Sequence, residues 1–301
     1  GNSQMNEYLN KLRKLLEKNH YEDVDNTMEY YEELFADKRE AGESDEDILR
    51  EMDDVEKVAE EILGKKLIDI EDDNKKGIIR AMDISLFSCD LVVNTGNTDE
   101  VLVDASDDDN LIVETVGDKL VIKEKNHTNQ IFQHQTNDYS IHIELPVETI
   151  LDEVNMSIAS SDLSIDGNMF IYKMYVKSAS ADISINQVEV DELNIKIASG
   201  DISIRDNSVE RLVIQSASGD IYLKNVIGAC CAISNVSGDI KTQSIDYSNI
   251  ECKTTSGDMS LCLSGDDEMY TIYKNAKVIG NGANIVKLKS LSGDIDIDFY
   301  D

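Results

Sequence analysis

Seven aspartates recur at near-constant spacing through the C-terminal half of the chain, most regularly within the sequence Ser-Gly-Asp-Ile. They are Asp162, Asp182, Asp201, Asp220, Asp239, Asp258 and Asp294, separated by 20, 19, 19, 19, 19 and 36 residues. If successive copies stack at the distance between hydrogen-bonded strands, about 4.8 Å, their carboxylates form a column of like charges. Such a column needs either a counter-charge or hydrogen-bond donors.

Two arrangements can satisfy these carboxylates. One is a divalent cation, which makes Asp201, Asp220, Asp239 and Asp258 the candidate calcium ligands. The other is an Asx-type turn, in which each carboxylate accepts backbone N–H groups beside its serine. We favour the turn and expect no metal or cofactor, because a residue repeated in every unit is more typical of structure than of catalysis.

The other residues that could do chemistry show no spacing typical of a site. The chain has four histidines, His20, His127, His134 and His142, and five cysteines, Cys89, Cys230, Cys231, Cys252 and Cys262. The histidine spacings match no common metal motif, and an odd number of cysteines without CxxC spacing indicates reduced thiols. The chain also lacks GxSxG, a phosphate-binding loop and HExxH.

Some parallel β-helices are polysaccharide lyases or hydrolases, whose sites need a non-repeating cluster of carboxylates or basic groups on one coil. Here the acidic residues repeat, and basic residues such as Lys224 and Lys241 look scattered. We therefore expect a non-enzymatic protein, with a carbohydrate-active β-helix enzyme as the least favoured alternative.

The chain is strongly acidic: 28 basic and 61 acidic residues give a formal net charge of −33 over 301 residues. Charge of this sign repels phosphate backbones and anionic lipid, so we expect neither nucleic acid nor an anionic membrane as a direct partner. No apolar run approaches the roughly 20 residues of a membrane span, and no signal peptide is visible. The sequence thus favours a cytoplasmic location, with the cell surface as the alternative if a native leader is missing before Gly1.

The repeat places its aspartates on short strands. In the unit that begins at Asp201, apolar residues follow one, three, eleven and thirteen positions later: Ile202, Ile204, Leu212 and Ile214. The neighbouring units share these columns, and positions two apart face the same side of a strand. Each unit therefore supplies two inward-facing strands, which predicts a mainly β fold, a parallel β-helix or solenoid of about 19-residue coils.

Glycine precedes the aspartate in the regular units, as expected at a tight corner. These glycines are Gly200, Gly219, Gly238, Gly257 and Gly293. Ser161 and Ala181 replace glycine in the first two units, so either the corner accepts a Cβ or those coils bend differently. Cys231 and Cys252 fall on core columns and are expected to pack as small hydrophobes.

Upstream of the regular units, residues 101–103, 111–113, 120–122 and 139–145 read as strands, the last closing at Pro146. Residues 88–93 echo the repeat, which predicts that the solenoid starts there with larger first coils. Residues 280–282 predict a turn in the irregular interval before Asp294.

Residues 5–63 predict three helices, the small all-α part of the fold. The second should end near Gly42, and the third should start at the N-cap Ser44 and end at Gly64. The expected organisation is a helical domain at 1–66, a linker at 67–79 and the solenoid at 80–301.

The helical segment resembles the HAAS or DUF1700-type domain of bacterial membrane-associated proteins. The resemblance rests on Tyr-Tyr-Glu-Glu-Leu-Phe-Ala-Asp at 30–37, Gly-Glu-Ser-Asp-Glu-Asp at 42–47 and Val-Ala-Glu-Glu-Ile-Leu at 58–63. Relatives commonly break the third helix with a Leu-Gly-Ser-Pro-like stretch, which Met-Asp-Asp-Val at 52–55 replaces here. The Ser-Gly-Asp-Ile repeat, over roughly 80–301, resembles the bacterial adhesin-like family of DUF4097-type β-solenoids.

Together these features predict a binding or scaffold protein, adhesin-like, whose solenoid surface contacts a protein or a glycan. The helical domain would act as an interaction module and could support dimerisation. The alternative, which rests on the resemblance alone, is an intracellular component of envelope-stress or signalling regulation.

Overall fold

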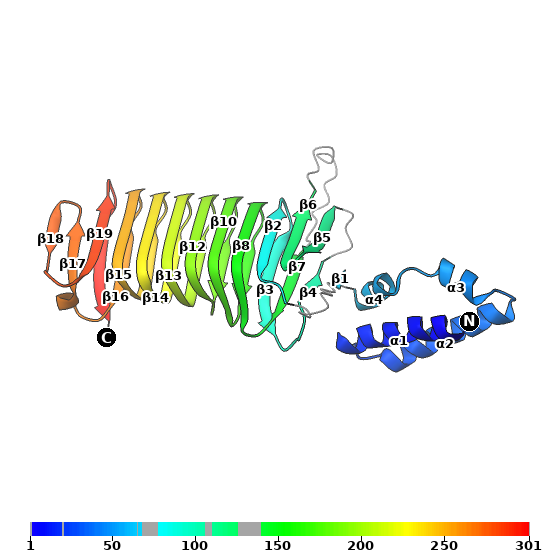
Figure 1. The fold of residues 1–301 in the computed structure, drawn as a ribbon. Coiled ribbons are helices and arrows are strands. Elements are labelled where there is room, and N and C mark those ends of the chain that lie inside the picture. The colour runs from blue at the N-terminus through cyan, green and yellow to red at the C-terminus, as the bar shows by residue number, and fades with distance from the viewer. Residues whose placement is uncertain are drawn as a thin grey trace, which may run out of the picture. The chain divides into compact units, whose positions relative to one another are not determined.

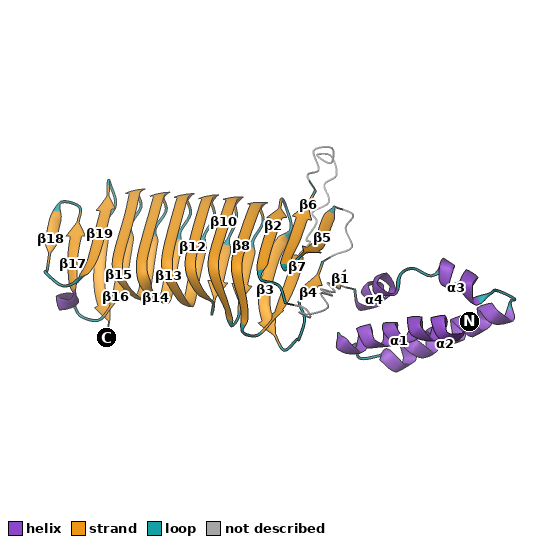
Figure 2. Ribbon diagram, viewed as in Figure 1, coloured by secondary structure: helices purple, strands orange, loops and turns teal. Residues whose placement is uncertain are grey.

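The structure is a computed structural model that describes residues 2–19, 21–64, 66–67, 78–105, 110–125 and 140–300. The chain divides into two compact units, Gly1–Leu67 and Ile68–Asp301. Helices make up the first and strands dominate the second (Figures 1 and 2). His20, His127 and His134 lie outside the described residues, as does most of the predicted linker.

Among its described residues the first unit has four helices, where three were predicted. They are α1 (Asn2–Lys18), α2 (Val24–Glu40), α3 (Asp45–Glu51) and α4 (Val55–Leu63), followed by the two-residue strand β1 (Lys66–Leu67). Leu12 and Leu16 of α1 pack with Met28 of α2 and Ala59 of α4 in one buried cluster. No described helix is long and apolar enough to span a membrane.

The predicted third helix breaks at Met52–Asp54, where α3 ends and α4 begins. Met52 and Asp54 are extended, with ψ of 142° and 143°. Both predicted ends of this region are confirmed: the Ser44 side chain accepts a hydrogen bond from the Asp47 N–H, and Gly64 is left-handed. The apolar pattern that predicted one helix continues across the break, because Met52 and Val55 both face the helical core.

The second unit is mainly β, as predicted. Its strands up to the first regular coils are β2 (Ala81–Leu86), β3 (Asp90–Gly96), β4 (Leu102–Asp104), β5 (Leu111–Val116), β6 (Lys119–Glu124), β7 (Ser140–Pro146), β8 (Thr149–Ser160), β9 (Leu163–Asp166), β10 (Met169–Ser180) and β11 (Ile183–Asn186). The later ones are β12 (Glu189–Ser199), β13 (Ile202–Ser218), β14 (Ile221–Ser237), β15 (Ile240–Ser256), β16 (Met259–Ser264), β17 (Tyr270–Lys274), β18 (Lys277–Ile279), β19 (Asn284–Ser290) and β20 (Ile295–Tyr300), with the 3-10 helix η1 (Asp267–Met269).

The strands of successive coils stack in parallel, and equivalent repeat positions lie side by side. Ile183 pairs with Ile202, Ile202 with Ile221, and Ile221 with Ile240. From β8 to β15 the colour in Figure 1 changes in sequence order along the solenoid. The predicted solenoid is thus observed, with one unit of the repeat per coil.

The first coil in the sequence is not the first in the stack. β2 lies between β6 and β8, and β3 lies between β7 and β9. The chain therefore forms the β2–β3 coil, adds β4 to β7 on its outer side, and returns at β8 on its inner side. Asp90 does begin the repeat, as predicted, but an added layer rather than larger first coils explains the long interval before Asp162.

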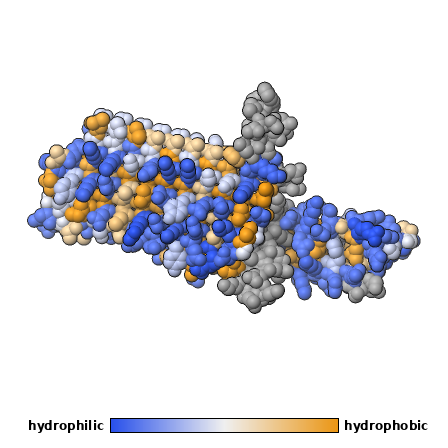
Figure 3. Space-filling model, turned by 45° about the horizontal axis from the view of Figure 1, so that its top comes forward, coloured by the Kyte–Doolittle hydropathy of each residue, from blue (hydrophilic) through white to orange (hydrophobic). Residues whose placement is uncertain are grey.

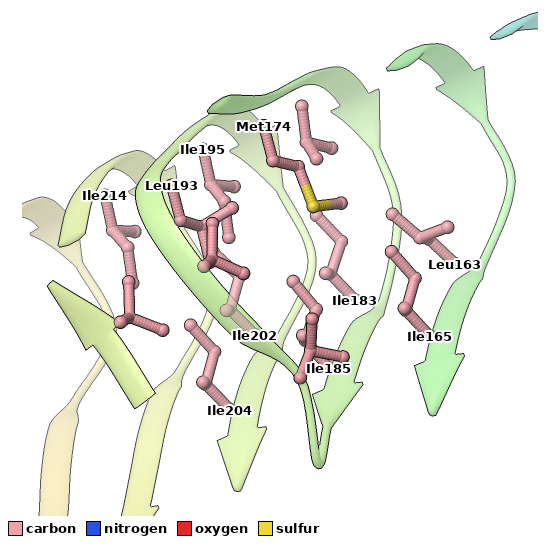
Figure 4. Packing of buried hydrophobic residues seen from close by; sticks show 14 of the residues in the cluster. Leu163, Ile165, Met174, Ile183, Ile185, Leu193, Ile195, Ile202, Ile204 and Ile214 are labelled. Carbon is pink, nitrogen blue, oxygen red and sulfur yellow. The ribbon is translucent and has the colours of Figure 1, made fainter. Parts of the chain in front are cut away.

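Each coil has three inward-facing pairs of residues, one more than the sequence predicted. Figure 4 shows the first and last pairs, with Ile202 and Ile204 facing the interior from one wall and Leu193 and Ile195 from another. The missed pair lies six and eight residues after the aspartate. In one coil it is Ile245 and Tyr247, both fully buried.

At the inward positions six and eight residues after the aspartate, two side chains place polar groups in the core. Asn207, 4% exposed, donates from Nδ2 to the Ile185 carbonyl at 2.7 Å and accepts from the Val188 N–H at 2.6 Å. The Tyr247 hydroxyl reaches across one coil and donates to the Val209 carbonyl at 2.7 Å. Gly228 lies in between, and a Cβ there would approach the Tyr247 ring at 2.7 Å. The glycine therefore leaves room for the tyrosine.

The glycine before each aspartate is needed for close approach of the coils. A Cβ on Gly219 would overlap the Gly200 carbonyl oxygen, and the φ of Gly219 is +116°. Ala181 occupies the same place without a positive φ. The backbone at the Ala181 corner therefore differs from that at Gly200, Gly219 and Gly238, whose φ values are positive.

The irregular interval before Asp294 is one coil with an inserted hairpin. β16 pairs with β20 and β15 pairs with β19, as in a regular coil. The hairpin lies between β16 and β19 in the sequence: β17 pairs with β18 in antiparallel and with β19 in parallel. The segment predicted as a turn, 280–282, connects β18 to β19.

Candidate functional site

The aspartate column is a ladder of hydrogen bonds between coils. Oδ1 of each aspartate accepts the backbone N–H of the aspartate in the next coil. For example, the Asp201 carboxylate accepts from Asp220 at 2.8 Å, and the Asp220 carboxylate accepts from Asp239 at 2.9 Å. The ladder runs from Asp90 to Asp294. The carboxylates thus bind backbone N–H groups, as predicted, but those of the neighbouring coil rather than those of their own turn.

The four calcium candidates, Asp201, Asp220, Asp239 and Asp258, all belong to this ladder. Within the described ranges, no group of three or more histidine, cysteine or acidic side chains is arranged to hold a metal ion. The geometry assigns the aspartates the role of joining successive corners.

Cys231 and Cys252 lie in the core, as predicted. Burial raises the pKa of the Cys231 thiol well above its usual value and that of Cys252 to about 12. Both thiols therefore stay protonated near neutral pH, which disfavours a nucleophilic role. His142, the one described histidine, is half-buried and lies 2.8 Å from the Asn94 side-chain oxygen.

A carboxylate that the sequence did not single out holds the turn before β3. Glu124, 6% exposed, accepts the backbone N–H groups of Phe87 at 2.9 Å, Ser88 at 2.8 Å and Cys89 at 3.1 Å. Burial acts to raise the Glu124 pKa, but hydrogen bonds from Cys89, Ser88 and Phe87 outweigh it and leave the pKa below its usual value. The group therefore stabilises the fold as a carboxylate.

A continuous row of basic and neutral side chains runs along one wall of the solenoid. In spatial order it contains Lys123, Ser85, Ser157, Lys177, Lys196, Gln215, Ser234, Lys253 and Lys289, each in register with the next. We call these nine residues the lysine column. The column could not be predicted from the sequence, because its members share no residue type: Lys196, Gln215 and Ser234 follow one another in it.

The lysine column is positively charged, whereas the chain as a whole is negatively charged. Acidic residues outnumber basic ones by 61 to 28 overall, yet the column has five lysines and no acidic residue. Lys253 pairs with Glu251 at 3.0 Å, whereas Lys177, Lys196 and Lys289 form no ion pair with any described residue. These three ammonium groups remain available for an anion.

A shallow furrow follows the lysine column on its corner side. Its floor consists of small or apolar outward side chains: Phe87, Ala159, Ala179, Ala198, Ala217 and Val236. Two depressions of about 470 and 290 Å³ make up the furrow, and Lys177 lines both. Hydrophilic and hydrophobic patches alternate over the solenoid in the view of Figure 3. The furrow and the lysine column together form the candidate binding face.

A larger depression, of about 720 Å³, lies at a different corner, beside Ile150 and Phe170. Its charged lining residues are Glu148, Glu189 and Asp206, so the site is acidic. Glu148 and Asp206 also adopt positive φ values of 64° and 55°. The repeat uses this left-handed residue to turn each corner, so the depression follows from the coil geometry.

Comparison with solved structures gives low similarity. A crystal structure from Parabacteroides distasonis ATCC 8503, named "Putative lipid binding protein", is 18% identical, with 75% of this chain and 94% of that chain covered and a TM-score of 0.44. A "putative cell adhesion protein" from Clostridium sporogenes ATCC 15579 is 9% identical, with coverage of 74% and 94% and a TM-score of 0.27. No curated protein matches the chain.

Family models match both units. The HAAS model matches residues 7–61, and the Toastrack DUF4097 model matches residues 79–275. Both predicted resemblances are confirmed. The second match spans most of the chain and all of the regular coils, so the chain belongs to the Toastrack DUF4097 family.

Proposed function

We propose that the chain is a non-enzymatic binding protein whose solenoid holds a protein or glycan ligand on the candidate binding face. The helical unit serves as a second interaction module. The observation that carries the proposal is the furrow with its lysine column, because it is an accessible, regular surface with unpaired cations.

The rigidity of the solenoid supports a binding role. Successive coils are joined by parallel strand pairing, by the aspartate ladder and by a continuous apolar core. A face built on such strands keeps its side chains at fixed spacing, so a ligand meets a preorganised surface. Extended regular faces of this kind are how repeat proteins usually contact their partners.

The arrangement of reactive groups supports a non-enzymatic reading. The repeated carboxylates accept backbone N–H groups, and the buried thiols are held protonated. In the furrow, the charged lining residues are the lysines Lys177 and Lys196, with no carboxylate beside them to act as a general acid or base.

The helical unit offers a surface of its own. Tyr30 of α2 is 61% exposed and packs edge-on against Tyr31, with 5.2 Å between the ring centroids. Exposed tyrosine is typical of protein interfaces. This supports a protein partner, or a second copy of the chain, for the helical unit.

The test uses full-length protein on arrays of glycans and peptides. Ala198→Trp fills the furrow from an exposed position, and Ser260→Trp places the same side chain at an exposed position on another wall. We expect ligands of the wild-type chain to be lost with Ala198→Trp and retained with Ser260→Trp. Loss of the ligands with Ser260→Trp but not with Ala198→Trp would refute the proposal. So would the absence of any ligand for the wild-type chain on either array.

A further inference from the structure

We infer that the lysine column binds a linear acidic glycan, laid along the solenoid axis with its anionic groups against the lysines. This inference rests on the proposed function and names the class of ligand for the same face. It follows from the order of residues in the column, the shape of the furrow and the distribution of charge.

Four of the five lysines occur as neighbouring pairs, with neutral polar residues between the pairs. Lys177 is in register with Lys196, and Lys253 with Lys289. Gln215 and Ser234 occupy the two strands between the pairs. Strands lie about 4.8 Å apart, so the column from Lys177 to Lys289 extends over about 24 Å. An extended glycan advances a comparable distance per sugar, so one sugar can face each strand.

The side chains between the lysines suit sugar hydroxyls. Serine hydroxyls both donate and accept hydrogen bonds, and glutamine offers two donors and an acceptor. Ser157 and Ser234 are exposed within the column, as is Gln215. A glycan bearing carboxylate, sulfate or phosphate groups at intervals would thus match cations and neutral polar groups in turn.

The furrow suits a flat, extended chain. Its floor of Ala179, Ala198 and Ala217 lets a ligand lie close to the sheet while Lys177 and Lys196 reach it from one side. The furrow suits a peptide less well. The face is the middle of a sheet rather than an edge, so it cannot add a strand, and its small residues form no deep pocket for an anchor.

Charge favours an acidic ligand at the lysine column, although the chain as a whole is acidic. The overall charge of −33 repels polyanions at long range, but the repulsion is screened over about 10 Å at 0.1 M salt. Within that distance, a ligand in the furrow meets Lys177 and Lys196 first. A single row of cations also selects a single chain with spaced charges over duplex nucleic acid, whose charge is denser.

The experiment measures binding of oligogalacturonate, about ten sugars long, to the full-length chain by calorimetry at about 0.1 M salt, where the long-range repulsion is screened. Lys177→Glu with Lys196→Glu reverses two charges of the column, and Lys224→Glu with Lys241→Glu makes the same charge change at exposed positions outside it. We expect the first pair to weaken binding about tenfold or more, equivalent to about 1.4 kcal/mol, and the second pair to change it by less than about threefold. Methyl-esterified oligogalacturonate, which lacks the charges, should bind more weakly than the acid form.

Three outcomes would overturn the inference: equal weakening by both pairs of substitutions, equal binding of the esterified and acid oligomers, or tighter binding of poly-glutamate or single-stranded DNA of matched charge. The two proposals fail separately. If array ligands are lost with Ala198→Trp but are unaffected by Lys177→Glu with Lys196→Glu, the binding role stands and the acidic-glycan assignment falls.

Discussion

Replacing Glu124 tests how the solenoid is held where the repeat begins. The carboxylate accepts three consecutive backbone N–H groups, of which that of Cys89 belongs to a buried residue and those of Phe87 and Ser88 belong to exposed ones. A buried donor left without a partner costs about 1–3 kcal/mol, and donors that water can reach cost less. Glu124→Ala should therefore lower the free energy of unfolding by about 3–4 kcal/mol.

Glu124→Gln is the closer comparison, because it keeps the size of the side chain and one acceptor oxygen. It removes the charge and places an NH2 group against backbone donors, so a loss of about 2 kcal/mol is expected at pH 7. The Glu124 pKa is lowered in the folded chain, so its contribution is complete above the unfolded pKa, near 4.3 by reference values, and is lost as the pH falls through the folded pKa. The difference between wild type and Glu124→Gln should shrink below about pH 4.

The assay is urea unfolding followed by circular dichroism at several pH values, with hydrogen exchange of the peptide that contains residues 87–89 as a local readout. Asp166→Asn, which removes a surface carboxylate from β9, serves as the control. Equal unfolding midpoints for wild type and Glu124→Gln at pH 7 would refute the reasoning. So would a difference that stays constant down to pH 3.

Three further predictions concern the coils. Gly219→Ala should destabilise the chain by more than about 2 kcal/mol, because the Cβ meets the Gly200 carbonyl and φ is positive, whereas Ala181→Gly should cost less than about 1 kcal/mol in urea unfolding; equal effects would contradict the account of the corners. Tyr247→Phe should lower stability by about 1–2 kcal/mol, since it leaves the buried Val209 carbonyl without its donor, and a thermal melt that matches wild type would show that the bond contributes nothing. A chelator should leave the melting temperature unchanged, because the ladder aspartates accept backbone N–H groups; a large drop on chelation would restore calcium as their partner.

The coil could be predicted from the sequence because its largest columns are chemically uniform. Ile183, Ile202 and Ile221 repeat one residue type at constant spacing, and the structure places them in register. The third inward pair escaped notice because Asn207 and Gly228 interrupt its columns. The role of each residue depends on a neighbouring coil, because Asn207 contacts Ile185 and Gly228 contacts Tyr247.

Two other features depend on contacts that the sequence order conceals. The return of the chain at β8 places β2 beside residues about 70 positions later, as in the pairing of Ala81 with Glu153. The candidate binding face depends on outward positions, where no common residue type marks the column: Lys196, Gln215 and Ser234 differ in chemistry but share a wall. The lysines that looked scattered, Lys224 and Lys241, are indeed outside it.

The most direct measurement of the central claim is lysine acetylation of the wild-type chain, read by mass spectrometry with and without saturating oligogalacturonate. The account predicts that the ligand protects Lys177, Lys196, Lys253 and Lys289, which are exposed along one wall. Lys224 and Lys241 should be modified at the same rate in both samples. Protection of Lys224 and Lys241, or equal modification of all six lysines with and without the ligand, would contradict the account.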